Sequence, residues 1–301
     1  MRIRRPGRVR DGIWFLGREE SGIYLLEGKN GSMIISGGMS YIVPDVLHQF
    51  KEFGMDEEKI TKLLILHSHF DHVGIVPFLK RRHPEMEVYA SARAWDILQM
   101  PKAIATINEF SRNLSKRMGR EDVYSAYDLE WRNDVTGRTV QEGDRIDLGG
   151  LALSILEIPG HSSCTIAAWA PGIRTLFPTD GGGIPFNKTI VAFGNSNYTK
   201  YQESLERMKD LEVEYYCADH YGFITGDEAR TFVSKTIEMA KQKRAQMEEV
   251  YRSTKDVDHA AKILISSFYD ENPYYLLPPE IFLDVYRQMI RHIASVIDGK
   301  V

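Results

Sequence analysis

The stretch LILHSHFDHVG, residues 64–74, constrains this chain more than any other. Its leading aliphatic run is typical of a buried central strand. Four polar side chains follow at once: His67, His69, Asp71 and His72. Such groups are costly to place beside a core unless they bind something. The fold must therefore bring the end of a buried strand to a site that holds them.

Short apolar or alternating runs separated by glycines occupy the first half of the chain. DGIWFLG, SGIYLLEG and GSMIISGG indicate a β-meander. Helical spacing is predicted for residues 43–53 and for most of residues 91–119, and VGIVPFLKRRHP predicts a helix that ends before Pro84. EVYAS predicts a strand, and VQEGDRIDLGGLALSILEIPG predicts a hairpin around Gly149 and Gly150.

The pattern changes after about residue 226, and helical periods continue to the end apart from the loop DENPYYLLPP. Two domains are predicted. Residues 1–225 carry the polar cluster, and residues 226–301 form a helical extension that packs on the core or caps it. Core packing is the expected role of most apolar residues in this extension.

Composition limits the class of protein. The chain has 301 residues, of which 43% are hydrophobic and 27% charged, so a substantial core is expected and disorder is not. The net charge of -4 gives no basic field for nucleic acid. The start, MRIRRPGRVR, could touch an anionic partner, but a solvated arm or an edge strand explains it better.

No stretch is apolar enough for a membrane span or a secretory signal, and Cys164 and Cys217 form no disulfide framework. We therefore expect a cytoplasmic protein that acts on a small-molecule substrate, without nucleic acid or membrane partners. A homodimer is the default oligomer.

The spacing of the first four polar residues suits metal binding. His67 and His69 are two apart and can share a direction, whereas Asp71 and His72 follow in the turn. One metal ion fits the first pair and a second fits the next pair. Imidazole and carboxylate ligands suit zinc, iron, manganese or similar ions.

Further candidate ligands occur where other apolar strands end. ILEIPGHSS contains His161, TLFPTDGGG contains Asp180, and YYCADHYG contains His220. Each residue alone has an ordinary alternative explanation. Asp180, for example, stands beside three glycines and would suit a turn. Together they complete two ligand sets. The remaining histidines lie in helical or flanking segments and are interpreted as structural or solvated: His48, His83, His259 and His292.

These motifs resemble those of the metallo-β-lactamase superfamily. HSHFDH resembles its H-x-H-x-D-H signature, IPGHSS its Gly-His motif and FPTDGG its bridging-aspartate motif, and the match covers roughly residues 12–225. The resemblance implies an α/β (α+β) fold, a four-layer αββα sandwich with metals at one edge. Residues 1–225 would then be the catalytic domain.

The resemblance also implies a role for each ligand, with two divalent ions as cofactors, zinc first and iron or manganese as alternatives. The first ion would take His67, His69 and His161; the second would take Asp71, His72 and His220; Asp180 would bridge them. This set is similar to that of the glyoxalase-II-like, lactonase and ribonuclease-Z-like branches. The classical antibiotic-degrading zinc enzymes have a cysteine where Asp180 stands.

Two positions depart from the family pattern. Ser36 in MIISGGMS stands where many members have an aspartate that supports the metal site. A hydroxyl is a weaker, neutral partner, so the surroundings of the ligands must differ. Cys164 stands where the Gly-His motif usually continues with glycine, and a small buried residue is expected there.

The implied reaction is hydrolysis of a carboxylic ester, a thioester of the acyl-CoA or glutathione type, or a lactone by a metal-bridging hydroxide. Asp71 and Asp180 would hold the hydroxide, and Asp71 is also the candidate to move a proton. Tyr221 and, as a second candidate, Tyr198 could reach a substrate oxygen. Residues 274–277 could line an apolar cleft, although packing between helices explains them equally well.

The same residues are compatible with other reactions. A sulfur (persulfide) dioxygenase with one iron ion would retain this type of motif. A metal-dependent phosphodiesterase or ribonuclease is disfavoured by the acidic balance of the chain. A diiron redox protein is disfavoured because His69 stands where that pattern usually has a glutamate. A non-catalytic metal-binding or sensory role fits a complete ligand set least well.

Overall fold

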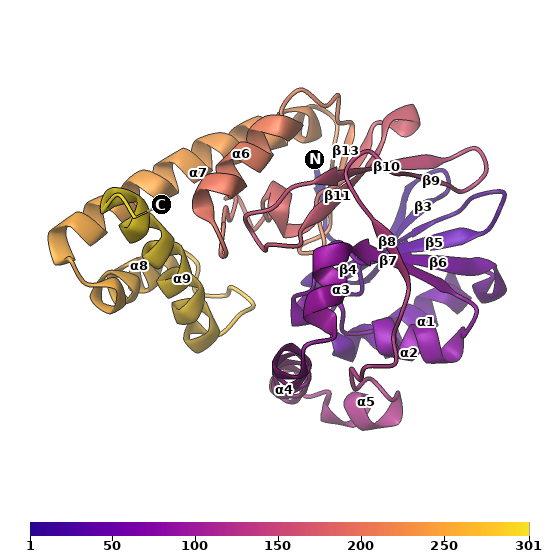
Figure 1. The fold of residues 1–301 in the computed structure, drawn as a ribbon. Helices are drawn as coiled ribbons and strands as arrows, with labels where there is room; N and C mark the ends of the chain where they lie inside the picture. Colours follow the sequence, from indigo (N-terminus) through magenta and orange to yellow (C-terminus); the bar gives the residue numbers. More distant parts are fainter. Residues whose placement is uncertain (301) are drawn as a thin grey trace.

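The structure is a computed structural model that describes residues 1–300, and it contains two β-sheets that pack face to face (Figure 1). The first sheet has seven strands in spatial order: β2 (Gly7–Arg10), β3 (Ile13–Arg18), β4 (Ser21–Leu26), β5 (Ser32–Ile35), β6 (Ile60–Leu64), β7 (Glu87–Ser91) and β8 (Arg138–Val140). The second also has seven: β1 (Arg2–Ile3), β14 (Phe223–Thr225), β13 (Tyr215–Cys217), β12 (Thr175–Phe177), β11 (Ile166–Ala170), β10 (Ala152–Glu157) and β9 (Arg145–Asp147).

The first sheet changes from antiparallel to parallel along its width. Strands β3, β4 and β5 form the predicted meander, whereas β5, β6, β7 and β8 are parallel neighbours. Parallel neighbours need crossover connections, and helices supply them. Helix α1 (Val43–Glu52) connects β5 to β6, and α2 (Val76–Arg82) connects β6 to β7. Strand β6, which precedes the histidine cluster, thus lies inside the sheet, as predicted.

Helices cover the outer face of each sheet. Five helices lie on the first sheet: α1, α2, α3 (Ala92–Leu98), α4 (Pro101–Arg117) and α5 (Glu121–Ala126). Their apolar side chains share one core with that sheet. On the second sheet lie α6 (Tyr198–Met208) and α7 (Asp227–Thr254). The layers are therefore helix, sheet, sheet, helix, which confirms the predicted αββα sandwich.

The core between the sheets explains why the strands carry so many apolar residues. Phe15 and Tyr24 from the first sheet meet Leu153 and Phe177 from the second, all almost without exposure. The rings of Tyr24 and Phe177 lie 5.3 Å apart in an edge-on arrangement that aromatic pairs favour. This packing fixes the two sheets against each other and thereby fixes the loops at their edges.

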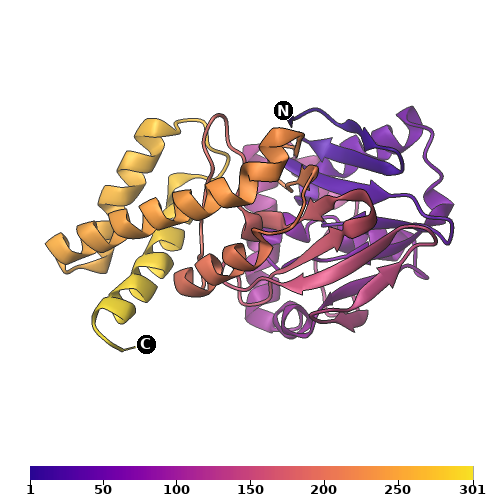
Figure 2. The ribbon, with the colours of Figure 1, turned by 90° about the horizontal axis from the view of Figure 1, so that it is seen from above.

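The C-terminal helices extend from the second sheet. Helix α7 begins beside β13 and β14 and extends away from the sandwich to α8 (Val257–Glu271) and α9 (Pro279–Ile297), which pack against each other (Figure 2). Their aromatic side chains share one core with the second sheet, to which Tyr216 of β13 belongs. Phe193, in the loop before α6, packs against Phe268 and Phe282 in that core. The extension thus packs on the sandwich, and the division into two domains stays a prediction. Within residues 1–300, no helix combines the length and apolarity required to cross a bilayer.

Candidate metal centre

Four loops bring the seven predicted ligands to one edge of the sandwich. The segment after β6 carries His67 and His69 and then forms the short turn η3 (Phe70–His72). From the second sheet come the loop after β10, the turn η5 (Thr179–Gly182) after β12, and the turn after β13. These hold the remaining ligands: His161, Asp180 and His220. Because each loop leaves a buried strand, the side chains start from rigid positions.

The first cluster contains three imidazoles. The Nε2 atom of His67 and the Nε2 atom of His161 lie 3.2 Å and 3.1 Å from the Nδ1 atom of His69. Nitrogen atoms that share a tetrahedral zinc ion at about 2.1 Å would be roughly 3.4 Å apart, so these separations fit one ion. The rings of His67 and His161 are buried and His69 is half-buried.

The second cluster contains two imidazoles and two carboxylates. The Nε2 atoms of His72 and His220 lie 3.1 Å apart, and Asp71 Oδ2 lies 3.5 Å from the Nε2 atom of His220. Asp180 Oδ2 lies 3.2 Å from His72 Nε2 and also 3.5 Å from His161 Nε2 in the first cluster. Asp180 is therefore placed between the clusters, where a bridging ligand has to lie.

The chemistry of these atoms fits two cations. Asp180 Oδ1 is buried and has no hydrogen-bond partner within residues 1–300, which is costly for a carboxylate unless a cation is beside it. In each cluster the potential ligand atoms all lie within 4.8 Å of one another. The seven residues thus form a site of the binuclear type, and their individual roles as ligands stay predictions.

Hydrogen bonds on the far side of the rings hold the histidines in place. The Nδ1–H groups of His161 and His220 donate to the carbonyl oxygens of Phe193 and Glu20, at 2.9 Å and 2.7 Å. Such a bond fixes the tautomer, so that the unprotonated Nε2 atom faces the cluster and can bind a metal.

The pKa values of the imidazoles are shifted in opposite directions in the two clusters. Burial lowers the pKa of His67 and of His161, and it lowers the pKa of His69 to about 3. Burial acts in the same direction on His72 and His220, but neighbouring carboxylates, Asp180 first, outweigh it and raise the pKa of both rings. Protons therefore compete with a metal ion more strongly at His72 and His220 than at the three imidazoles of the first cluster.

Steric contacts explain why the residue before His161 in the Gly-His motif is a glycine. Gly160 has a φ of +132°, and a Cβ atom on it would lie 2.2 Å from the backbone nitrogen of Tyr201 in α6. Its carbonyl oxygen accepts hydrogen bonds from the backbone N–H groups of Ser196 and Asn197. Glycine lets the loop lie directly against the start of α6, which sets the position of the next residue, His161.

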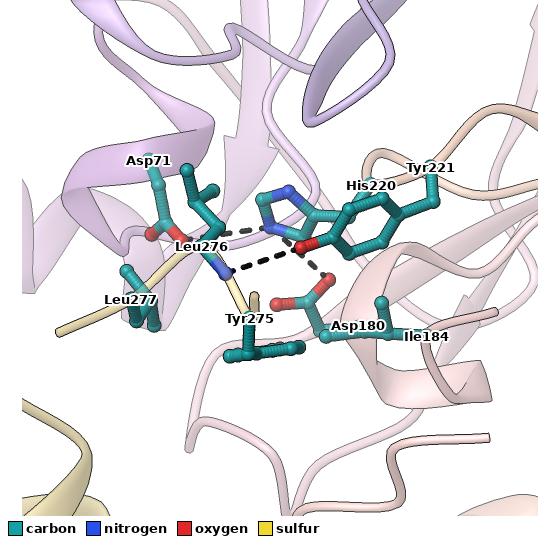
Figure 3. A pocket seen from close by; sticks show the side chains of 8 residues that line it. All are labelled: Asp71, Asp180, Ile184, His220, Tyr221, Tyr275, Leu276 and Leu277. Atoms are coloured by element: carbon teal, nitrogen blue, oxygen red, sulfur yellow. Dashed lines mark hydrogen bonds and ion pairs between the residues drawn. The ribbon is translucent and has the colours of Figure 1, made fainter. Parts of the chain in front are cut away.

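A small cavity opens onto the second cluster (Figure 3). Asp71, Asp180 and His220 form its polar side, and Ile184 and Tyr221 form part of its wall. The far wall comes from the loop between α8 and α9, through three residues: Tyr275, Leu276 and Leu277. The helical extension therefore contributes to the site as well as to the core.

Two of the residues predicted to lie near a substrate are elsewhere. Tyr274 is 88% exposed and is not part of the cavity wall, unlike the three residues that follow it. Tyr198 is fully buried, and its hydroxyl lies within hydrogen-bonding distance of the carbonyl oxygens of Ala192 and Ala240. Its prediction as a substrate contact is wrong, because helix α6 turns this ring into the core below the site.

Tyr221 does lie at the cavity. Its hydroxyl accepts a hydrogen bond from the backbone N–H of Leu276 at 3.3 Å, which connects the turn after β13 to the α8–α9 loop. Its φ of 62° is unusual for a non-glycine residue and orients the ring toward Tyr275 and Phe186. Cys164 is buried as expected, with its sulfur 3.1 Å from the hydroxyl oxygen of Ser162.

Sequence reasoning missed two polar residues behind the ligands. Asp219, immediately before His220, has its Oδ2 atom 2.7 Å from Nδ1 of His72. The Thr179 hydroxyl, immediately before Asp180, lies 3.2 Å from the Nδ1 atom of His67. The available signal was their position beside predicted ligands, at the ends of buried strands.

The fold and the site define a class, the αββα proteins with a binuclear His/Asp metal centre. Residues 16–220 match the model of the Metallo-beta-lactamase superfamily. The chain belongs to this superfamily, which confirms the resemblance found in its motifs.

Curated relatives are distant. A metallo-beta-lactamase fold-containing protein from Sulfurisphaera tokodaii is 24% identical over 207 residues, which are 67% of this chain and 73% of that protein. A hydroxyacylglutathione hydrolase from Rhodopseudomonas palustris is 27% identical over 173 residues, or 54% of this chain and 49% of that protein. This chain therefore aligns with about half the length of that hydrolase.

Solved structures share the whole architecture. A metallo-beta-lactamase family protein from Thermus thermophilus superimposes with a TM-score of 0.69 at 16% identity, covering 97% of this chain and 95% of that one. A beta-lactamase domain protein from Burkholderia ambifaria gives the same TM-score and identity, with coverage of 98% and 88%. Because nearly all of this chain is covered, the common fold includes the helical extension.

Proposed function

We propose that this protein is a binuclear metal-dependent hydrolase of carboxylic thioesters, esters or lactones. The observation that carries the proposal is the position of Asp180, whose carboxylate lies between a cluster of three imidazoles and a cluster of mixed ligands. Divalent ions held in such a pair of sites make water nucleophilic near neutral pH and polarise a carbonyl oxygen. Zinc suits the donor set best, with iron or manganese as alternatives.

Residues of this chain would supply the remaining functions. The carboxylate of Asp71 lines the cavity, and nearby His72 and His220 lower its pKa to about 2 against the opposing effect of burial. It is therefore ionised at neutral pH and can orient water or accept a proton. The α8–α9 loop covers the same cavity with apolar side chains, which suits an acyl group and excludes bulk water.

The comparisons support a thioester as the first substrate class. Several distant relatives carry the name hydroxyacylglutathione hydrolase, and such a substrate is an acyl group on the sulfur of glutathione. A thioester presents one carbonyl and an easily expelled thiolate, so water activation and carbonyl polarisation suffice for its cleavage. We therefore place thioesters before esters and lactones.

The test combines a metal count with a substrate panel. Protein purified without chelator should contain two divalent ions per chain and hydrolyse at least one of an acylglutathione, an acyl-CoA, an aryl ester and a lactone. The His69→Ala variant should lose most of this activity, whereas His48→Ala, which alters a histidine on the exposed face of α1, should keep it. A single iron per chain with oxygen uptake would instead point to sulfur oxidation, and equal activity of both variants would contradict the proposal.

Replacing Tyr221 by phenylalanine tests its predicted catalytic role. The change removes the hydroxyl that accepts the hydrogen bond from Leu276 and that faces the cavity. We expect kcat/KM to fall by about 10- to 100-fold, the effect of losing one or two hydrogen bonds, with two metal ions still bound. Steady-state kinetics and metal analysis measure both. Tyr274→Phe, at an exposed neighbour, is the control and should leave kcat/KM unchanged.

A further inference from the structure

One buried carboxylate has no part in the proposed ligand set. Asp71, Asp180 and Asp219 are the buried acidic residues within residues 1–300, and the first two line the cavity. Asp219 is 2% exposed and lies behind the rings, away from that cavity. No lysine or arginine forms an ion pair with it among the described residues. A buried charge without such a partner needs another source of compensation.

Three polar groups converge on a single oxygen of this side chain. Asp219 Oδ2 lies 2.7 Å from His72 Nδ1, and it accepts hydrogen bonds from the hydroxyls of Ser36 at 3.0 Å and Thr179 at 2.6 Å. The three groups come from different elements: the segment after β5, the turn η3 and the turn η5. The carboxylate therefore joins both sheets behind the metal centre.

Asp219 contacts a histidine of the second cluster directly and a histidine of the first cluster only indirectly. His72 belongs to the second cluster and bonds directly to Asp219. His67 belongs to the first cluster and is connected only through the Thr179 hydroxyl, at 3.2 Å. A carboxylate that accepts from the outer nitrogen of a ligating histidine fixes its ring and increases its basicity. Loss of Asp219 should therefore weaken metal binding by the second cluster more than metal binding by the first.

Residue 36 contributes a neutral hydroxyl, and no charge, to this group of contacts. Ser36 has a φ of 70°, a conformation in which aspartate and asparagine are more common than serine. Serine at this position contributes a short neutral donor that points to Asp219. The negative charge behind the metal centre is thus contributed by residue 219, and residue 36 donates a hydrogen bond to it.

We propose that Asp219 is the positioning residue of the metal centre, and that it sets the metal affinity of the second cluster by orienting His72. The proposal rests on the metal centre of the proposed function but not on any substrate. Asp219 does not contact the cavity, so it acts through His72 and, more weakly, through Thr179 and His67. It also adds a third negative charge, beside those of Asp71 and Asp180, to a site suited to two divalent cations.

The experiment is a zinc titration of chelator-treated full-length protein in competition with a chromophoric chelator. Wild type should show two sites. Asp219→Asn, which keeps size and removes the charge, should weaken one site by about 10- to 100-fold and the other clearly less. In a His69→Ala background, which disables the first cluster, the remaining site should show the full loss. Ser36→Ala removes a neutral donor to the same oxygen and should change either affinity less than about threefold.

Thermal unfolding of the metal-free proteins separates positioning from a structural role. If Asp219→Asn binds zinc as wild type does, or if both sites weaken equally while the metal-free protein loses stability, the proposal is wrong. If Asp219→Asn cannot be purified folded, Asp219→Glu keeps the charge but displaces the carboxylate from the Nδ1 atom of His72, and a second-cluster zinc affinity equal to that of wild type in that variant overturns the proposal. Wild-type protein that binds no zinc, iron or manganese would instead contradict the proposed function itself.

Discussion

Asp180→Ala is expected to reduce hydrolysis by about a thousandfold or more, equivalent to about 4 kcal/mol of transition-state stabilisation. The carboxylate lies 3.2 Å from His72 Nε2 and 3.5 Å from His161 Nε2, so its loss removes a ligand from both clusters at once. Metal analysis after dialysis should show fewer than two ions per chain. Loss of a ligand in only one cluster, as in His69→Ala, should leave more metal bound.

The control for this variant is Asp210→Ala, which removes an exposed carboxylate just beyond helix α6. Its activity and metal content should equal those of wild type. Circular dichroism of Asp180→Ala should match wild type, because Asp180 lies in a turn and its Oδ1 atom has no protein hydrogen bond within residues 1–300. Full metal content and activity in Asp180→Ala would contradict its placement as the bridging ligand.

Lowering the pH is expected to release metal from the second cluster before the first. Burial opposes the charged form of His72 and His220, but Asp180 and the other carboxylates outweigh it and raise the pKa of both rings. Below these raised pKa values a metal ion must displace a proton from each ring. Each displaced proton weakens the apparent affinity about tenfold per pH unit.

The first cluster should respond less. Burial keeps the pKa of His67, His69 and His161 below that of free histidine, so protons compete with a metal ion less at these rings than at His72 and His220. Zinc titrations at about pH 8, 7 and 6, together with the protons released in weak buffer, measure both effects. Parallel weakening of the two sites, or binding without proton release, would contradict the assignment.

Much of the fold could be predicted because its signals are local. The meander, the buried strand before the histidines and the hairpin at Gly149 follow from short runs of apolar residues and glycines, and all are present. Helix α5 and strand β8 were not predicted, because the apolar residues between positions 120 and 140 follow neither a clear helical period nor a clear strand period. Those elements are held by packing against α4 and β7.

The site shows the same division between local and distant signals. Tyr198 was a second candidate to reach a substrate oxygen, but it begins helix α6 and faces the core. Tyr274 and Tyr275 are adjacent and chemically identical, yet one is exposed and the other lines the cavity. Only the packing of α8 and α9 distinguishes them.

By itself, the sequence determined the superfamily and the identity of the seven candidate ligands. Those residues stand at the ends of apolar strands, and their type and short-range spacing express the demands of metal binding directly. Tertiary structure alone decided what surrounds them. His72 and Asp219 are 147 positions apart, and Tyr221 and Leu276 are 55 apart. Hydrogen bonds between such distant residues depend on how two sheets and a helical extension pack, and no local pattern records that packing.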